Sequence, residues 1–210
     1  MQVNKADSVK HEKPSSCRFC GIAQHERLIR AYSNSVVVPS LGAFIEGWTL
    51  VIPRRHYIAI ADIPDDEWNI FDAELEDHRS AMKRQYSSII EFEHGAAGPN
   101  RKAGCGTDHA HRHFVPCISN DMNIRDLIGR CPEFRGRFKW IDADDRPRAR
   151  RGLDYIWIHD NTGTWITYDR WQPSQVVRRA LARRMALLEW DWKKNNRIDI
   201  ATRTLLTLTQ

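Results

Sequence analysis

The sequence lacks a long hydrophobic run. Among its 210 residues no apolar stretch approaches the roughly 20 residues that a helix needs to span a bilayer. We therefore expect a protein without membrane-spanning segments. Residues 1–16, MQVNKADSVKHEKPSS, contain no apolar core of the signal-peptide kind, and they predict a mobile polar tail on a cytoplasmic protein.

Cysteine is also scarce. The chain has five cysteines, an odd number that is too low for a disulfide-stapled secreted domain. Two of them, Cys17 and Cys20 in CRFC, have the separation that lets two thiolates bind one tetrahedral zinc ion. A redox dithiol is the alternative, but a glycine follows Cys20 and no parallel-sheet pattern adjoins the pair. We interpret Cys117 and Cys131 as ordinary core or loop cysteines.

The N-terminal part has no excess of positive charge. Residues 1–120 carry 14 basic and 15 acidic side chains, whereas residues 121–210 carry 18 and 12, so the net charge of +5 arises in the C-terminal part. A basic excess favours anionic partners, phosphorylated small molecules as much as nucleic acid. The chain has no internal repeat or low-complexity tract, and its length suits one domain with additions.

The pattern of apolar residues predicts an α+β fold. Short apolar runs at Ser35–Val38, Thr49–Pro53 and Ser88–Gly95 are typical of strands. Between Asp65 and Tyr86 apolar residues recur every three or four positions, which indicates one long amphipathic helix. Together with a later strand that carries histidines, these segments predict an antiparallel sheet of about five strands with the helix packed on one face.

The C-terminal part predicts an α/β extension packed on the same domain. A hairpin is expected around Asn161–Gly163, and a helix capped by Ser174 is expected to turn Val177, Leu181 and Leu188 inward. The predicted organisation is a tail at residues 1–16, a main domain at 17–120 and the extension at 121–210.

Three of the nine histidines alternate in GCGTDHAHRHFVP, from Gly104 to Pro116. Alternate side chains of a strand share one face at a spacing of about 6.6 to 6.8 Å, so His109, His111 and His113 would form a row. A histidine-rich strand on a solvated face is the alternative. Histidine is not a favoured strand residue, however, and the neighbouring glycines suit close approach to a ligand.

HAHRHFVP, GWTLVIPRRH, the long helix and FEHG, taken together over residues 17–116, resemble the histidine triad (HIT) superfamily of nucleotide hydrolases and transferases, which includes galactose-1-phosphate uridylyltransferase. The resemblance implies a HIT-like fold in which residues 17–120 are the catalytic domain and the middle histidine, His111, attacks an α-phosphate. Zinc-carrying members imply a structural zinc ion held by Cys17, Cys20, His56 and His109. The segment YIWIHD…SQVVRRA…EWDWK is similar, more loosely, to an extension of some bacterial members.

Further residues are candidates for the site. His109, His111 and His113 are the catalytic candidates, and His113 with the backbone amides of AGCGT would stabilise phosphate charge. Arg112 stands where the family usually has an apolar residue, so the far face of this strand is either solvated or paired with an acid. Trp48 stands where many small members carry histidine. The candidate substrate-binding residues are Cys105, Gly106, Thr107, His94, Gln175 and Arg178; for Arg178, a solvated basic helix face is an equal alternative.

The leading hypothesis is a nucleotide hydrolase or nucleotidyltransferase that forms a covalent nucleotidyl-histidine intermediate on a nucleotide or sugar nucleotide. One alternative is a zinc-stabilised module that binds nucleic acid or processes its ends. Another is a HIT-fold enzyme with altered chemistry. We also expect a homodimer, whereas the base, the leaving group and the acceptor depend on pocket shape and cannot be predicted from sequence.

Overall fold

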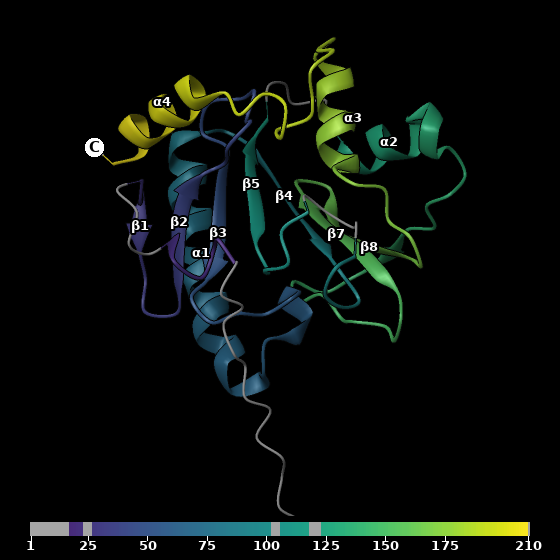
Figure 1. Cartoon of the computed structure of the whole chain (residues 1–210), viewed down its shortest axis with the longest axis horizontal. Helices are drawn as coiled ribbons and strands as arrows, with labels where there is room; N and C mark the ends of the chain where they lie inside the picture. Colours follow the sequence, from purple (N-terminus) through teal and green to yellow (C-terminus); the bar gives the residue numbers. More distant parts are fainter. Residues whose placement is uncertain (1–16, 23–26, 102–105, 118–122, 210) are drawn as a thin grey trace, which may run out of the picture.

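The computed structural model of the chain describes residues 17–22, 27–101, 106–117 and 123–209, so the tail predicted at residues 1–16 lies outside it. Its strands form one antiparallel sheet in the order β1-β2-β3-β5-β4-β7-β8-β6, with helices on both faces (Figure 1). The α+β class is confirmed. The elements are β1 (Arg30–Ala31), β2 (Ser35–Pro39), β3 (Thr49–Pro53), η2 (Ile60–Asp62), α1 (Asp65–Gln85), β4 (Ile89–Gly95), β5 (Arg112–Pro116), α2 (Ile124–Arg130), η3 (Pro132–Phe134), β6 (Ile141–Asp142), β7 (Asp154–Asp160), β8 (Gly163–Asp169), α3 (Val176–Arg184) and α4 (Ile198–Leu208).

The C-terminal part continues the sheet. β1 to β5 agree with the predicted number of about five strands in the main domain, although no sequence pattern indicated β1. β7 then pairs with β4 from Glu91–His159 to Gly95–Tyr155. β7 and β8 form the predicted hairpin, whose ladder closes at Asp160 and Gly163. This pairing satisfies backbone groups along β4 that would otherwise form an open edge inside the molecule. The extension therefore shares one sheet with the first part of the chain.

Helix α1 covers one face of the sheet. It ends one residue before the predicted Tyr86, and three acidic residues in its first turn complement the helix dipole. Phe71, Leu75 and Met82 are buried in a cluster that includes Phe114 of β5. α2 and α3 lie against the opposite face in a second apolar cluster. None of the helices within the described residues has the length and apolar character needed to cross a membrane.

The helix predicted in the extension is shorter than expected. α3 begins after Gln175, which has φ of 57°, and Ser174 is not its cap. Val177 and Leu181 are buried as predicted, but Leu188 is 93% exposed, so its predicted inward position is wrong. The helix ends at Arg184, and Ala186 adopts φ of 54°, which turns the chain out of the helix. The sequence pattern also missed α2 and α4.

A buried charge network lies on the α1 side of the sheet, behind the histidine segment. Arg112 is fully buried, with its guanidinium 3.8 Å from the ring centroid of Trp157 and 3.9 Å from Glu91. Glu91 also accepts hydrogen bonds of 2.5 and 3.0 Å from Arg79. Of the two environments that the sequence left open for Arg112, the structure therefore shows the acid-paired one.

Replacing Gly95 by alanine should destabilise the junction between β4 and β7. A Cβ atom on Gly95 would lie 2.0 Å from the Tyr155 ring, so the buried ring must shift. We expect Gly95→Ala to lower the free energy of unfolding by about 1–3 kcal/mol, as measured by denaturant titration. Gly98→Ala is the matched control, because a Cβ there meets no heavy atom within 4 Å. Equal stability of the two variants would contradict this packing.

Glu93 should make stability depend on pH. Its carboxylate accepts hydrogen bonds of 2.7 Å from the Ile60 amide and the Tyr155 hydroxyl, but burial raises its pKa from 4.5 to about 7. Because the pKa of Glu93 is higher in the folded protein than in the unfolded chain, protonation of Glu93 favours folding. Its contribution to the free energy of unfolding is fully present below pH ~4.5 and is lost as the pH rises through about 7. Urea titrations should show the unfolding free energy of the wild type falling relative to Glu93→Gln over this range. Parallel pH profiles would disprove the assignment.

Candidate functional site

The three alternating histidines divide between two sites. β5 begins at Arg112, so His109 and His111 lie in the segment before it and only His113 is in the strand. The strand is therefore shorter than the sequence predicted. The rings of His111 and His113 have centroids 4.9 Å apart, whereas the His109 ring lies 4.9 Å from that of His56. His109 therefore belongs to a cluster with His56, and the other two histidines face a cavity.

Hydrogen bonds fix the two cavity histidines in opposite tautomers. The Nδ1 atom of His111 lies 2.8 Å from the carbonyl oxygen of His109, which can only accept, so Nδ1 carries the proton and Nε2 the lone pair. The indole nitrogen of Trp48, which can only donate, lies 3.0 Å from Nδ1 of His113, so that ring carries its proton on Nε2. One ring thus offers a lone pair and its neighbour a proton.

Burial keeps both imidazoles neutral. Burial, with a smaller effect from the charges of Arg18 and Arg178, lowers the pKa of His111 to about 4, although the bond to the His109 carbonyl opposes this. Burial also lowers the pKa of His113 well below its ordinary value. A neutral imidazole with a free Nε2 lone pair is a nucleophile at neutral pH.

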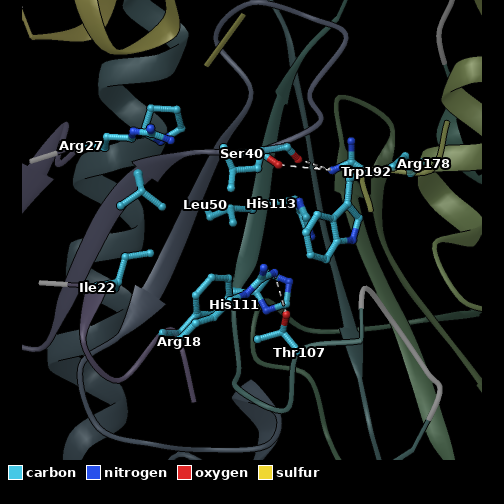
Figure 2. Close-up of a pocket in the computed structure, with 14 residues that line it drawn as sticks. Arg18, Ile22, Arg27, Ser40, Leu50, Thr107, His111, His113, Arg178 and Trp192 are labelled. Carbon is cyan, nitrogen blue, oxygen red and sulfur yellow. Dashed lines mark hydrogen bonds between the residues drawn. The ribbon is translucent and has the colours of Figure 1, made fainter. Parts of the chain in front are cut away.

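A cavity of about 650 Å³ opens beside these two rings (Figure 2). Three arginines line it, and no aspartate or glutamate is found among the described residues of its wall. The N-terminal segment and strands β2 and β3 contribute apolar side chains. The complete lining is Arg18, Phe19, Ile22, Arg27, Val38, Pro39, Ser40, Leu41, Leu50, Thr107, His111, His113, Arg178 and Trp192.

Arg178 reaches the cavity from α3. It is only 2% exposed, so the alternative of a solvated helix face is wrong. Its guanidinium donates hydrogen bonds to the carbonyl oxygen of Gly42 at 2.5 Å and to Oγ of Ser40 at 3.3 Å, and it lies 4.4 Å from the Trp48 ring centroid. These contacts hold a positive charge on the same wall as His113.

The other predicted substrate-binding residues lie differently. Thr107 lines the cavity, whereas His94 and Gln175 are not part of its wall. The Gln175 amide donates to Asp191 at 2.9 Å and accepts from the backbone of Trp192, so it holds the loop that carries Trp192.

Gly106 is also absent from the wall; it lies beside Lys193, whose Nζ atom would be 2.7 Å from a Cβ on the glycine. Cys105 lies outside the described residues. Among the wall residues that the sequence pattern missed are Arg18 and Trp192. The position of Arg18 inside CRFC was a signal that could have identified it.

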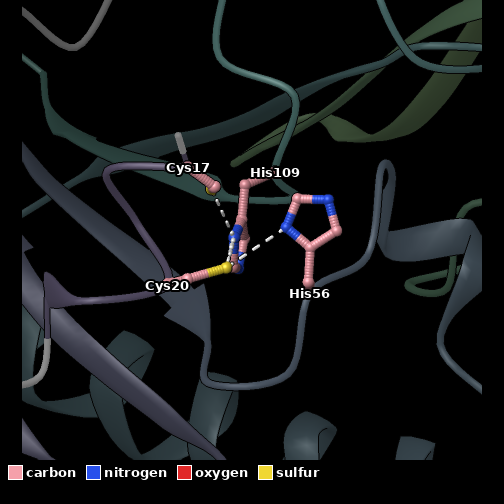
Figure 3. Close-up of side chains that lie close together, drawn as sticks. All are labelled: Cys17, Cys20, His56 and His109. Atoms are coloured by element: carbon pink, nitrogen blue, oxygen red, sulfur yellow. Dashed lines mark hydrogen bonds between the residues drawn. The ribbon is translucent and has the colours of Figure 1, made fainter. Parts of the chain in front are cut away.

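The second site is a cluster of four ligand-type side chains. The ligand atoms of Cys17, Cys20, His56 and His109 all lie within 4.8 Å of one another (Figure 3). Cys17 Sγ is 3.4 Å from Nδ1 of His109, and Cys20 Sγ is 3.4 Å from Nδ1 of His56. A tetrahedral zinc ion would set such sulfur–nitrogen distances at about 3.5 Å. The predicted ligand set therefore forms a cluster that could hold a metal ion.

The ring orientation of His109 suits metal binding. Its Nε2 atom lies 2.8 Å from the carbonyl oxygen of Pro53, which can only accept, so the proton is on Nε2 and Nδ1 faces the sulfurs with its lone pair. Pro53 ends β3, the strand that precedes His56. The same segment thus provides one candidate ligand and orients another.

Comparisons with known proteins identify relatives of the chain, although no family model matches it. An uncharacterized HIT-like protein of Saccharolobus solfataricus is 29% identical over 132 residues, which cover 60% of this chain and 91% of that protein. An uncharacterized HIT-like protein of Mycobacterium tuberculosis is 28% identical over 108 residues, or 50% of this chain and 74% of that protein.

Solved structures are more distant. A hypothetical histidine triad nucleotide-binding protein from Sulfolobus tokodaii is 17% identical and has a TM-score of 0.42, covering 50% of this chain and 71% of that one. The assignment of a family rests instead on the two HIT-like relatives and on the alternating histidines, two of which line the cavity. These two relatives support assignment of the chain to the histidine triad superfamily.

Proposed function

We propose that this protein is a nucleotide hydrolase or nucleotidyltransferase that acts at an α-phosphate through His111. The observation that supports this most strongly is the pair of opposite tautomers at the cavity. The lone pair on Nε2 of His111 and the proton on Nε2 of His113 supply a nucleophile and a hydrogen-bond donor side by side. The volume of the cavity is in the range of small-molecule binding sites.

The proposed reaction has two displacements at phosphorus. Nε2 of His111 forms a bond to the α-phosphorus while the bond to the leaving-group oxygen breaks and its electrons leave with that oxygen. Water or another acceptor hydroxyl then attacks the nucleotidyl-histidine and releases its proton to solvent, and the imidazole of His111 departs with the electrons of the phosphorus–nitrogen bond. His113 donates to a phosphate oxygen throughout, and the charge of Arg178 stabilises the negative charge that develops there.

The cavity wall supports a nucleotide or sugar nucleotide as substrate. Arg18, Arg27 and Arg178 favour an anionic ligand, since no carboxylate is found among the described wall residues. Apolar side chains, among them Phe19, Val38 and Leu50, offer a surface for a base. We propose residues 17–120 as the catalytic domain and residues 121–210 as an extension that completes the cavity with Arg178 and Trp192.

We further propose that the cysteine–histidine cluster holds a structural zinc ion. Two thiolates and two imidazoles make a closed set of four ligands, which leaves no position for substrate. Zinc would contribute no step of the reaction; bound there, it ties the Cys17–Cys20 turn to the segment that leads into β5. His109 is then a ligand that positions its carbonyl for His111 and does not itself react. The homodimer stays a prediction.

His111→Asn should abolish turnover and leave the fold intact. Asparagine keeps a compact polar side chain but has no nucleophilic nitrogen, so activity should fall by at least ~10³-fold. His113→Asn should cost about 2–4 kcal/mol of transition-state stabilisation, as for loss of one oxyanion donor. Steady-state hydrolysis across nucleotides and sugar nucleotides measures both effects. His159→Asn is the control, because His159 lies in β7 and bonds Thr164 outside the cavity.

Trapping the intermediate tests the mechanism directly. Acid-labile, base-stable label from an α-labelled nucleotide should appear on the peptide that contains Gly104 to Pro116. Label on another peptide would move the nucleophile, and full activity of His111→Asn would rule the mechanism out.

One zinc ion per chain should be found by metal analysis, and Cys17→Ser should lose it. Because metal bound only to the folded state stabilises that state, the loss should cost about 2.7 kcal/mol where free zinc is at a hundredfold excess over its Kd. Thermal unfolding with and without zinc measures the difference. Cys117→Ser is the matched control, since Cys117 is half-buried and outside the cluster. A metal-free, equally stable wild type would refute the zinc site.

A further inference from the structure

We propose that Arg18 binds the phosphate next to the α-phosphate of a nucleotide, and that the metal-site turn holds Arg18 in place for this task. The inference rests on the proposed function and narrows it to nucleotides that carry at least two linked phosphates. It also makes metal binding and nucleotide binding interdependent. Arg18 is a binding and positioning residue in this proposal, not a reacting group.

The turn that carries Arg18 is held on both sides of this residue. Arg18 lies between Cys17 and Cys20, whose backbones are joined by a 3.2 Å hydrogen bond from the Cys20 amide to the Cys17 carbonyl. Their sulfurs lie 3.4 Å from His109 and His56, respectively. The position of the Arg18 backbone therefore depends on the geometry of the four-ligand cluster.

The guanidinium of Arg18 connects three segments at the cavity. It donates a 3.0 Å hydrogen bond to Oγ1 of Thr107, and its central carbon lies 4.3 Å from the ring centroid of Trp192 (Figure 2). Thr107 is in the loop before the histidines, and Trp192 follows α3 in the extension. Arg18, Thr107 and Trp192 all belong to the cavity wall.

Arg18 and Arg178 occupy different depths. Arg178 is buried and shares a wall with Ser40 and His113, whereas Arg18 is exposed and bonds a hydroxyl group. A phosphate within reach of His111 would be met by the charge of Arg178, and the next phosphate toward the cavity mouth by Arg18. The charged guanidinium of Arg18 donates to a neutral hydroxyl of Thr107. Replacing that acceptor by an ionised phosphate oxygen would pair two opposite charges, which favours binding.

Linkage follows from this arrangement. If the bound metal orders the turn that presents Arg18, the metal raises nucleotide affinity, and by thermodynamic reciprocity the nucleotide raises metal affinity by the same factor. Arg18 is the group through which this proposal connects the metal-site turn to the second phosphate, whereas the His109 carbonyl and the Phe19 ring contact His111. Removing the Arg18 side chain should therefore remove the contact and most of the coupling.

The first test compares Arg18→Ala with Arg27→Ala by titration calorimetry in zinc-loaded His111→Asn protein, which cannot turn over. Arg27 is the matched control, an exposed arginine on the same cavity wall but outside the Cys17–Cys20 turn. The ligands are nucleoside monophosphates and diphosphates of the four common bases. Arg18→Ala should weaken diphosphate binding about tenfold more than monophosphate binding, whereas Arg27→Ala, which removes a charge from the same wall, should change that ratio far less.

The second test removes zinc with a chelator, with circular dichroism to confirm that the protein stays folded. Diphosphate affinity should fall about five- to twentyfold in the His111→Asn protein and much less when Arg18 is also alanine. If the metal-free protein unfolds, zinc affinity measured by chelator competition with and without diphosphate gives the same coupling. An equal effect in both proteins overturns the linkage.

The outcomes separate this inference from the proposed function. An unchanged diphosphate-to-monophosphate ratio in Arg18→Ala overturns the role of Arg18, while labelling of His111 in the wild type would leave the proposed function standing. Absence of nucleotide binding together with absence of label overturns both.

Discussion

The site depends on the pairing of β4 with β7. This ladder joins the extension to the first five strands, and the extension supplies two wall residues, Arg178 and Trp192. Side chains on the α1 face support the same junction: Tyr155 of β7 donates to Glu93 of β4, and Trp157 of β7 covers the guanidinium of Arg112. Without this pairing the cavity would lose the wall that carries its buried positive charge.

The same sheet separates two kinds of chemistry on its two faces. Arg112 lies between His111 and His113 in sequence but turns toward buried acids on the α1 side. The two histidines turn to the cavity, where burial keeps them neutral and fixed neighbours set their tautomers. Alternation along this segment places a charged structural group and two neutral imidazoles on opposite faces of the sheet.

The cysteine–histidine cluster and the cavity share parts of the backbone. The carbonyl of His109 fixes the tautomer of His111, while the ring of His109 faces the sulfurs of Cys17 and Cys20. Phe19, between those cysteines, places its ring edge-on against both His109 and His111. The cluster therefore adjoins the His111 ring through direct contacts.

Local patterns determined much of this structure. The period of apolar residues located α1 to within one residue, because an amphipathic helix on a sheet must repeat its apolar face every turn. Spacing and family resemblance together identified the four cluster residues, and the alternation of histidines brought His111 and His113 to the cavity wall.

Only the tertiary structure decided the rest. Leu188 follows a helical pattern yet is exposed, because a positive φ at Ala186 ends the path of α3. Arg178 has the sequence context of a solvated helix face, and packing against Trp48 and Gly42 buries it. Gln175 was predicted to reach the cavity but bonds the loop that carries Trp192, whereas Arg18, which was not predicted, lines the cavity. Arg178 bonds Gly42 across 136 positions and Arg18 bonds Thr107 across 89, and no local pattern encodes contacts so distant in the sequence.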